Sequence, residues 1–426
     1  MSIITGAAAS ALNTARRYAE RGSAELHYLQ KMITAGALGI EPPANLAAMV
    51  ADIRRWGEVG MIPALNARRT PHRLAIIDDE GSITYADLND AVNAVANGLL
   101  AMGVRGGDGV GILARNHRWF SIANYACARV GARTIMLNTE FSGPQIRDVA
   151  HREGAKLIIY DDEYTEAVRL ADTPLGKLRA LGPDPAASTP STSTDETLAE
   201  LISRSSIAPA PKATKRSSMI ILTSGTTGTP KGANRHAPPT LAPIGGVLSR
   251  VPFKSGEVTA LPSPMFHAIG YLHATIAATL GSTLVLHRRF NAGAVLDDIA
   301  KHKASAVVVV PVMLSRILDA LEVMNPKPDL SSLRIVFVSG SQLGAELATR
   351  AIKMLGPVVY NLYGSTEVAF ATIARPQDLM KNPATVGPVV KGATVKILDE
   401  HGGEVAQGQV GRIFVGTPMP FEGYTG

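Results

Sequence analysis

Strand-length apolar runs alternate with helical patterns along most of the chain after residue 59. The strand runs cover residues 74–77, 110–113, 134–137, 157–160, 218–223, 283–286, 306–310 and 334–339. Between the early runs, apolar residues recur every three or four positions over residues 85–102 and 120–130, a period typical of helices. This alternation predicts βαβ units and an α/β fold.

The two ends of the chain follow other patterns. Residues 1–58 read as a helical N-terminal extension: Leu26, Leu29 and Ile33 share one helix face, and Pro42 and Pro43 separate two helices. We expect that face to lie against the main body, although nearby basic residues leave open an interfacial helix with peripheral membrane contact. After residue 387, short strand patterns at 395–398 and 411–415 with glycine turns predict a small β-barrel or a distorted sheet.

Composition limits the classes of function. The chain has 426 residues, of which 46% are hydrophobic and 18% charged, and its formal net charge is +6. The dispersed basic residues and the lack of zinc-finger or RNP motifs argue against nucleic-acid binding, while a mild positive charge suits polyphosphate substrates. With one cysteine, no signal peptide and no apolar run long enough to span a membrane, the sequence predicts a cytoplasmic protein, with peripheral membrane association left open.

The segment that carries the most chemistry follows the strand at 219–222. It reads Thr223-Ser-Gly-Thr-Thr-Gly-Thr-Pro-Lys-Gly232. Glycines let a backbone approach a polyanion, N–H groups and hydroxyls donate to its oxygens, and a lysine adds a point charge, so the segment predicts a phosphate-binding loop. It is not a Walker A loop, because Pro230 and Gly232 stand where that motif needs Gly and Ser or Thr.

This loop resembles the signature of the adenylate-forming superfamily, which includes acyl-CoA synthetases, luciferases and peptide-synthetase adenylation domains. The resemblance extends over about residues 63–426 and is nearest to the large domain of long-chain fatty acyl-CoA synthetases. It implies that the loop binds the phosphates of ATP through Thr223, Ser224, Gly225, Thr226, Thr227, Gly228, Thr229 and Lys231.

A second segment, Tyr360-Asn-Leu-Tyr-Gly-Ser-Thr-Glu367, is similar to the Y-G-x-T-E motif of the same superfamily. The resemblance implies that Tyr363 stacks on adenine beside Gly364 and that Thr366 contacts the α-phosphate. Glu367, with Thr227, would hold Mg²⁺, for which a carboxylate is a suitable hard ligand.

Two further segments match more loosely. Ser339-Gly-Ser-Gln-Leu343 occupies the place of an adenine-pocket segment, which implies ATP contacts for Gly340 and Ser341. Pro264-Met-Phe-His267 resembles an aromatic-His element, which implies an acyl pocket formed by Phe266, His267 and Gly270.

The resemblance implies two αβαβα-type subdomains plus a small distorted β-barrel over residues 59–426, with the C-terminal small domain absent. The implied reaction is Mg²⁺- and ATP-dependent formation of acyl-AMP, followed by transfer to the cosubstrate coenzyme A. The residues implied in catalysis are Thr226, Lys231, His267, Thr366 and Glu367. Without the small domain, we expect residues 1–426 alone to make acyl-CoA poorly.

A fatty acid is the favoured substrate because residues 268–280 are largely apolar. An aryl or amino acid is less favoured. The alternatives are a fatty acyl-AMP ligase that delivers to a carrier protein and a non-catalytic module that binds nucleotide and acyl groups. The sequence also leaves a homodimer open.

Overall fold

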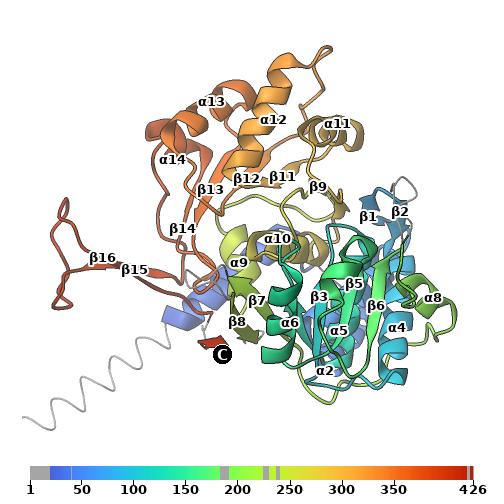
Figure 1. Ribbon diagram of the computed structural model, residues 1–426. Helices are drawn as coiled ribbons and strands as arrows, with labels where there is room; N and C mark the ends of the chain where they lie inside the picture. The colour runs from blue at the N-terminus through green and yellow to red at the C-terminus, as the bar shows by residue number, and fades with distance from the viewer. Residues whose placement is uncertain are drawn as a thin grey trace, which may run out of the picture.

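The computed structural model of the protein describes residues 20–39, 41–182, 191–223, 230–236, 240–419 and 423–425. Two large, mostly parallel sheets form its framework, and helices lie between them and on their outer faces (Figure 1). These layers confirm the predicted α/β class, because most of the expected runs form strands within one or two residues of their predicted bounds.

The first large sheet has eight strands in the order β14-β13-β12-β11-β9-β10-β1-β2. Its inner pairs are parallel, and the edge strands β14 and β2 run antiparallel to their neighbours. Strands β11 and β12 are buried at every position, which explains why their sequences are continuous apolar runs rather than alternating ones. The bounds are β1 Leu74–Asp78, β2 Gly81–Thr84, β9 Val258–Ala260, β10 Thr283–Val285, β11 Ala306–Val309, β12 Ile335–Val338, β13 Val359–Tyr363 and β14 Thr372–Ala374.

The second large sheet has seven strands in the order β17-β8-β7-β4-β3-β5-β6. Strands β4, β3, β5 and β6 pair in parallel with their neighbours, whereas β7, β8 and β17 form an antiparallel edge. The bounds are β3 Gly109–Leu113, β4 Arg133–Met136, β5 Ala155–Asp161, β6 Lys177–Leu181, β7 Ser218–Thr223, β8 Lys231–His236 and β17 Tyr424–Thr425. The sequence predicted β3, β4, β5 and β7, but not β6, the return strand β8 or the short strand β17.

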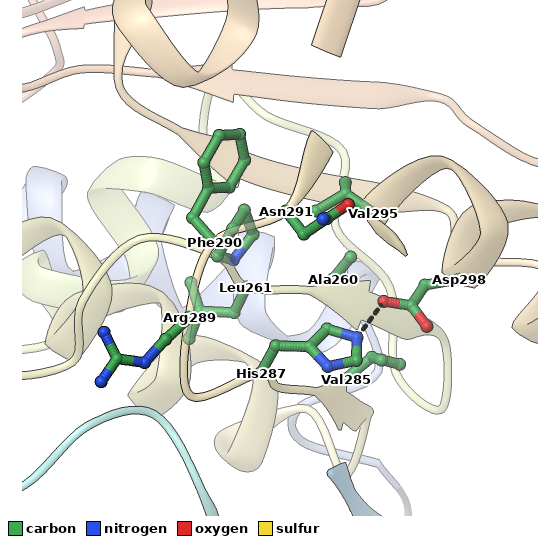
Figure 2. A pocket seen from close by; sticks show the side chains of 10 residues that line it. Ala260, Leu261, Val285, His287, Arg289, Phe290, Asn291, Val295 and Asp298 are labelled. Atoms are coloured by element: carbon green, nitrogen blue, oxygen red, sulfur yellow. Dashed lines mark hydrogen bonds and ion pairs between the residues drawn. The ribbon is translucent and has the colours of Figure 1, made fainter. Parts of the chain in front are cut away.

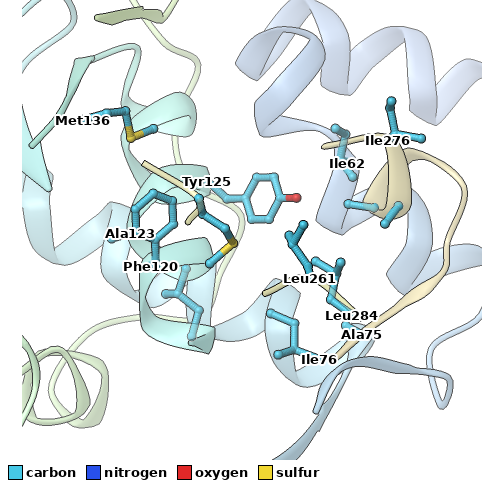
Figure 3. Packing of buried hydrophobic residues seen from close by; sticks show 14 of the residues in the cluster. Ile62, Ala75, Ile76, Phe120, Ala123, Tyr125, Met136, Leu261, Ile276 and Leu284 are labelled. Atoms are coloured by element: carbon cyan, nitrogen blue, oxygen red, sulfur yellow. The ribbon is translucent and has the colours of Figure 1, made fainter. Parts of the chain in front are cut away.

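Helices fill three layers around these sheets. The largest apolar cluster lies between the sheets and includes side chains of α4, α5, α9 and α10. Figure 3 shows part of it, including Phe120 of α5 and Ile276 of α10. Smaller clusters place α11 to α14 on the outer face of the first sheet and α6 and α7 on the outer face of the second. No helix of the described ranges is long and apolar enough to cross a membrane.

The helix bounds agree with local sequence signals. Thr84 caps α4, since its hydroxyl oxygen accepts the N–H of Asp87 at 3.2 Å, and Gly131 ends α5 in the left-handed conformation at φ 78°. The helices are α2 Pro43–Gly60, α3 Ile62–Arg69, α4 Tyr85–Ala101, α5 Arg118–Val130, α6 Gly143–Arg152, η1 Asp162–Tyr164, α7 Thr165–Val168, α8 Leu198–Ser203, α9 Ala242–Leu248, α10 Ala268–Thr279, α11 Ala292–His302, α12 Pro311–Val323, α13 Ala345–Leu355 and α14 Pro376–Lys381.

The helix over residues 20–34 lies against the body, but with a different face from the one predicted. Leu26 and Ile33 are 70% and 54% exposed, so the expectation that they meet the core is wrong. Tyr28 is fully buried instead, beside Gly245 and Gly392, because these glycines leave room for its large ring.

The second predicted helix of the extension is α2. Its C-terminal half reaches the core through Trp56, whose indole N–H donates to the Ala210 carbonyl at 3.0 Å. The predicted domain boundary at residue 58 falls beside Gly57, where φ 77° and ψ −178° interrupt the helix. The division into residues 1–58 and 59–426 stays a prediction.

The last sheet is a two-stranded antiparallel ribbon of β15 Thr394–Leu398 and β16 Arg412–Gly416, which projects from the body (Figure 1). Of the two predicted forms, a small barrel or a distorted sheet, the described part of this region shows only these two paired strands. Ile397 and Ile413, directly paired on one face, are 44% and 56% exposed.

Candidate active site

The predicted acyl-pocket segment follows β9, the strand at which the strand order of the first sheet reverses. From β9 the chain continues to β10 on one side, whereas β11, the other neighbour of β9, leads to β12. Ligands bind in α/β proteins at such a switch point, beyond the carboxyl ends of the strands. Residues 261–267 follow β9 directly, so the topology alone places the aromatic-His element where a ligand site is expected.

The Tyr363–Glu367 segment forms a tight loop between β13 and β14. The N–H of Ala371 donates to the Tyr363 carbonyl and that of Ala369 to the Ser365 carbonyl, both at 2.8 Å. Gly364 is required by space, because a Cβ there would lie 2.2 Å from the Ala369 carbonyl oxygen. Tyr363 is 39% exposed at the end of its strand, so its ring is accessible for stacking.

The Gly340 segment lies on the neighbouring strand end. Gly340 has φ 96°, a left-handed conformation that glycine adopts without strain, and Ser341 is exposed next to it. The Ser339 hydroxyl donates to the Leu362 carbonyl at 3.1 Å, which ties this loop to β13. The structure therefore brings Gly340 and Ser341 close to the Tyr363 loop.

The predicted phosphate-binding loop connects β7 to β8, which pair in antiparallel orientation. Thr223 pairs with Lys231 at its two ends, while the predicted ligands Ser224, Gly225, Thr226, Thr227, Gly228 and Thr229 lie outside the described residues. Gly232, the last residue of the motif, has a structural role: a Cβ there would lie 2.3 Å from the Thr425 hydroxyl and 2.6 Å from the Ile220 Cγ2.

A residue without a predicted role, Tyr424, connects the two main motifs. Its strand β17 pairs with β8, opposite Ala233. Its hydroxyl donates to the Glu367 carboxylate at 2.6 Å, and the Lys231 Nζ lies 5.5 Å from the centre of its ring. The hydrogen bond to Glu367 raises the pKa of Tyr424, so the phenol stays protonated and keeps donating. Lys231 and Glu367 thus contact the same side chain.

The aromatic-His element begins α10. Phe266 is buried, and its ring centre lies 4.5 Å from that of His267, the residue immediately before the helix. Burial lowers the pKa of His267, so the imidazole is neutral at pH 7. Gly270 has a packing role, since a Cβ there would lie 2.1 Å from the Pro264 carbonyl oxygen.

Comparison with known proteins settles the family. A family model for the AMP-binding enzyme family matches residues 64–425. The chain belongs to the AMP-binding enzyme family. It is 30% identical over 383 residues to a feruloyl-CoA synthase from Amycolatopsis sp, a match that covers 86% of this chain and 72% of that protein.

The chain is also similar to two other proteins. A fatty acid–[acyl-carrier-protein] ligase from Streptomyces coeruleorubidus is 26% identical over 381 residues, which are 85% of this AMP-binding enzyme and 69% of that protein. A crystal structure of a long-chain-fatty-acid-CoA ligase from Archaeoglobus fulgidus has a TM-score of 0.74 and 20% identity, over 87% and 76% of the two chains. The latter likeness confirms the predicted fold.

The AMP-binding enzyme has a small cavity at the carboxyl ends of β9 and β10, lined by Leu261, Phe290 and His287 among others (Figure 2). His287 is bonded at both ring nitrogens, to Asp79 at 2.6 Å and to Asp298 at 2.8 Å. These hydrogen bonds raise the pKa of His287 to about 9. The His287 side chain is therefore protonated and joins Asp79 to Asp298, which makes it poorly suited to act as a base.

The donor set fits MgATP. Glu367 offers a carboxylate of the kind that Mg²⁺ shares with phosphates, and Lys231 offers an ammonium group for phosphate oxygens. Across the described ranges, no group of three or more His, Cys, Asp or Glu side chains could hold a metal by itself. A single carboxylate is what a metal bound mainly by substrate phosphates and water requires.

Proposed function

We propose that this AMP-binding enzyme adenylates a fatty acid with MgATP and then transfers the acyl group to coenzyme A. The observation that supports it best is the convergence at Tyr424. Lys231 and Glu367 come from different sheets and from motifs far apart in the chain, yet both contact this side chain. One polyphosphate could therefore meet the ammonium group and, through Mg²⁺, the carboxylate.

In the first half-reaction, an oxygen of the fatty acid carboxylate forms a bond to the α-phosphorus of ATP, and the bond from that phosphorus to pyrophosphate breaks. We assign Lys231, Thr226 and Thr366 to the charge on the phosphate oxygens, and Glu367, with Thr227, to Mg²⁺. Bound Mg²⁺ would neutralise charge that develops on the phosphates. The protein's main contribution would be alignment and fixed charge.

His267 suits a place beside the attacking carboxylate because it is neutral. A protonated imidazole would form a strong ion pair with the carboxylate and lower its nucleophilicity. Burial lowers the pKa of His267, which leaves a ring that can hydrogen-bond without this cost. We assign it to orientation of the acid.

The composition of α10 supports a fatty acid as the substrate, since residues 268–279 are mostly apolar and include few polar side chains. An aromatic acid is the second candidate, and the likeness to a feruloyl-CoA synthase supports it. For the acceptor we propose coenzyme A. The alternative of a carrier protein is supported by the likeness to the fatty acid–[acyl-carrier-protein] ligase.

The test is exchange of labelled pyrophosphate into ATP, with a panel of medium- and long-chain fatty acids and hydroxycinnamic acids. We expect exchange that depends on a fatty acid. Exchange with hydroxycinnamic acids only would favour the aromatic candidate, and none with any acid would indicate a non-catalytic binding module. Chromatography of products formed with coenzyme A or with an acyl carrier protein then identifies the acceptor.

A further inference from the structure

Asn116 lies at the second switch point of the fold, outside every motif described above. Asn116 follows β3. From β3 the chain continues to β4 on one side, whereas β5, the other neighbour of β3, leads to β6. The residue is 4% exposed, and its side chain lies between the two large sheets. A buried amide needs hydrogen-bond partners, and those of Asn116 belong to the other sheet.

The Asn116 side chain forms three hydrogen bonds to one segment, residues 261–265. Its Nδ2 donates to the Leu261 carbonyl at 3.0 Å and to the Ser263 carbonyl at 2.9 Å, and its Oδ1 accepts the N–H of Met265 at 2.8 Å. These are alternate residues along the extended chain after β9. The amide therefore holds five consecutive residues in one backbone path, and Phe266 and His267 come next.

Asn116 is itself held by its neighbours. The N–H of Arg115 donates to the Asp161 carboxylate at 2.8 Å, and His117 contacts the same carboxylate at 2.8 Å. Arg118 binds Asp78 at the end of β1 through its N–H and its guanidinium. Because the residues on both sides of Asn116 are held by hydrogen bonds, the Asn116 backbone has little room to move. Its side chain therefore fixes the position of the segment that it binds.

A second side chain also anchors the segment. The Ser263 hydroxyl donates to the Val308 carbonyl at 2.9 Å, which fixes the segment to β11 of its own sheet. Asn116 supplies the connection to the second sheet, which carries the phosphate-binding loop between β7 and β8. Its bonds thus set the distance between the element assigned to the acid and the sheet assigned to ATP.

We propose that Asn116 is a positioning residue for the acid substrate: it holds residues 261–265 so that Phe266 and His267 face the reacting carboxylate. This inference rests on the proposed function. The sharpest variant is Asn116→Asp, which keeps the shape and the acceptor for Met265 but replaces the donor to two carbonyls with a repelling carboxylate oxygen. The matched control is Asn66→Asp, because Asn66 is 2% exposed and its Nδ2 donates to the Ala278 carbonyl at 2.7 Å, near the far end of α10.

The assay is acid-dependent pyrophosphate exchange, with separate titrations of the acid and of MgATP. For Asn116→Asp we expect the apparent KM of the acid to rise about tenfold and that of MgATP to stay within about twofold, since misplacement of a bound group by an ångström costs this much or more. For Asn66→Asp we expect a lower melting temperature with both constants unchanged. Equal changes in both constants, or the same acid KM in both variants, would overturn the proposal.

Amide hydrogen exchange gives a readout that does not need activity. Peptides that cover residues 261–267 should exchange faster in Asn116→Asp than in the wild type and in Asn66→Asp. If the wild type shows no acid-dependent pyrophosphate exchange, the proposed function fails, and unchanged protection of this segment would refute the positioning role by itself. Should Asn116→Asp not fold, Asn116→Ser, which keeps one donor, takes its place with the same expected order of effects.

Discussion

The Asp79–His287–Asp298 link allows a quantitative prediction about pH and stability. His287 follows β10, Asp79 follows β1 and Asp298 lies on α11, so the imidazolium connects three elements. Figure 2 shows its contact with Asp298. The pKa of His287 rises from 6.5 to about 9 on folding. Its stabilisation is therefore complete below pH 6.5 and is lost as the pH rises through about 9.

The magnitude follows from the pKa change and from exposure. A rise from 6.5 to about 9 corresponds to roughly 3 kcal/mol without solvent screening. The side chains of His287 and Asp79 are 32% and 44% exposed, so water screens the interaction and we expect about 1 kcal/mol. For a chain of this size, that is a change in melting temperature of roughly 2 °C.

The measurement is thermal unfolding of the wild type and of His287→Gln at several pH values between 6.5 and 9. The gap between the two melting temperatures should be largest at pH 6.5 and should narrow towards pH 9. His302→Gln is the matched control, because burial lowers the pKa of His302, so its protonation adds no stability that would be lost as the pH rises towards 9. Parallel curves for wild type and His287→Gln would show that the link carries no charge-dependent stability.

Three further predictions concern the site itself. Glu367→Gln should keep the fold but greatly reduce pyrophosphate exchange, because it removes the charge assigned to Mg²⁺; an unchanged rate would contradict the metal role. MgATP at about 100 times its dissociation constant should raise the free energy of unfolding by roughly 2.7 kcal/mol, and the lack of any thermal shift at millimolar MgATP would argue against a nucleotide site. Gly232→Ala should displace β17, since the added Cβ would lie 2.3 Å from the Thr425 hydroxyl. We expect the free energy of unfolding to fall by about 1–3 kcal/mol and much of the pyrophosphate exchange to be lost. Wild-type stability and exchange would show that the contact with Tyr424 is dispensable.

The N-terminal helix shows where periodicity misleads. Leu26, Leu29 and Ile33 form an apolar stripe, and a helix buries its most apolar face in most soluble proteins. In this protein the buried face is that of Tyr28 and Met32. The reason is steric: Gly245 and Gly392, more than 200 residues away, leave a recess that fits a tyrosine ring. Spacing along one helix contains no information about a recess elsewhere.

The sequence by itself predicted most of the parallel strands and the main helices, and it singled out residues 223–232 and Tyr363–Glu367 as candidate nucleotide-binding segments, because these depend on local apolar patterns and on residue types with specific chemistry. Only the tertiary structure decided which distant residues meet these motifs. Tyr424 reaches Glu367 because a two-residue strand pairs with β8 in one register, and Asn116 reaches Met265 because two switch points face each other. Such contacts depend on how two sheets are placed, which is set by packing summed over the whole interior rather than by any local segment.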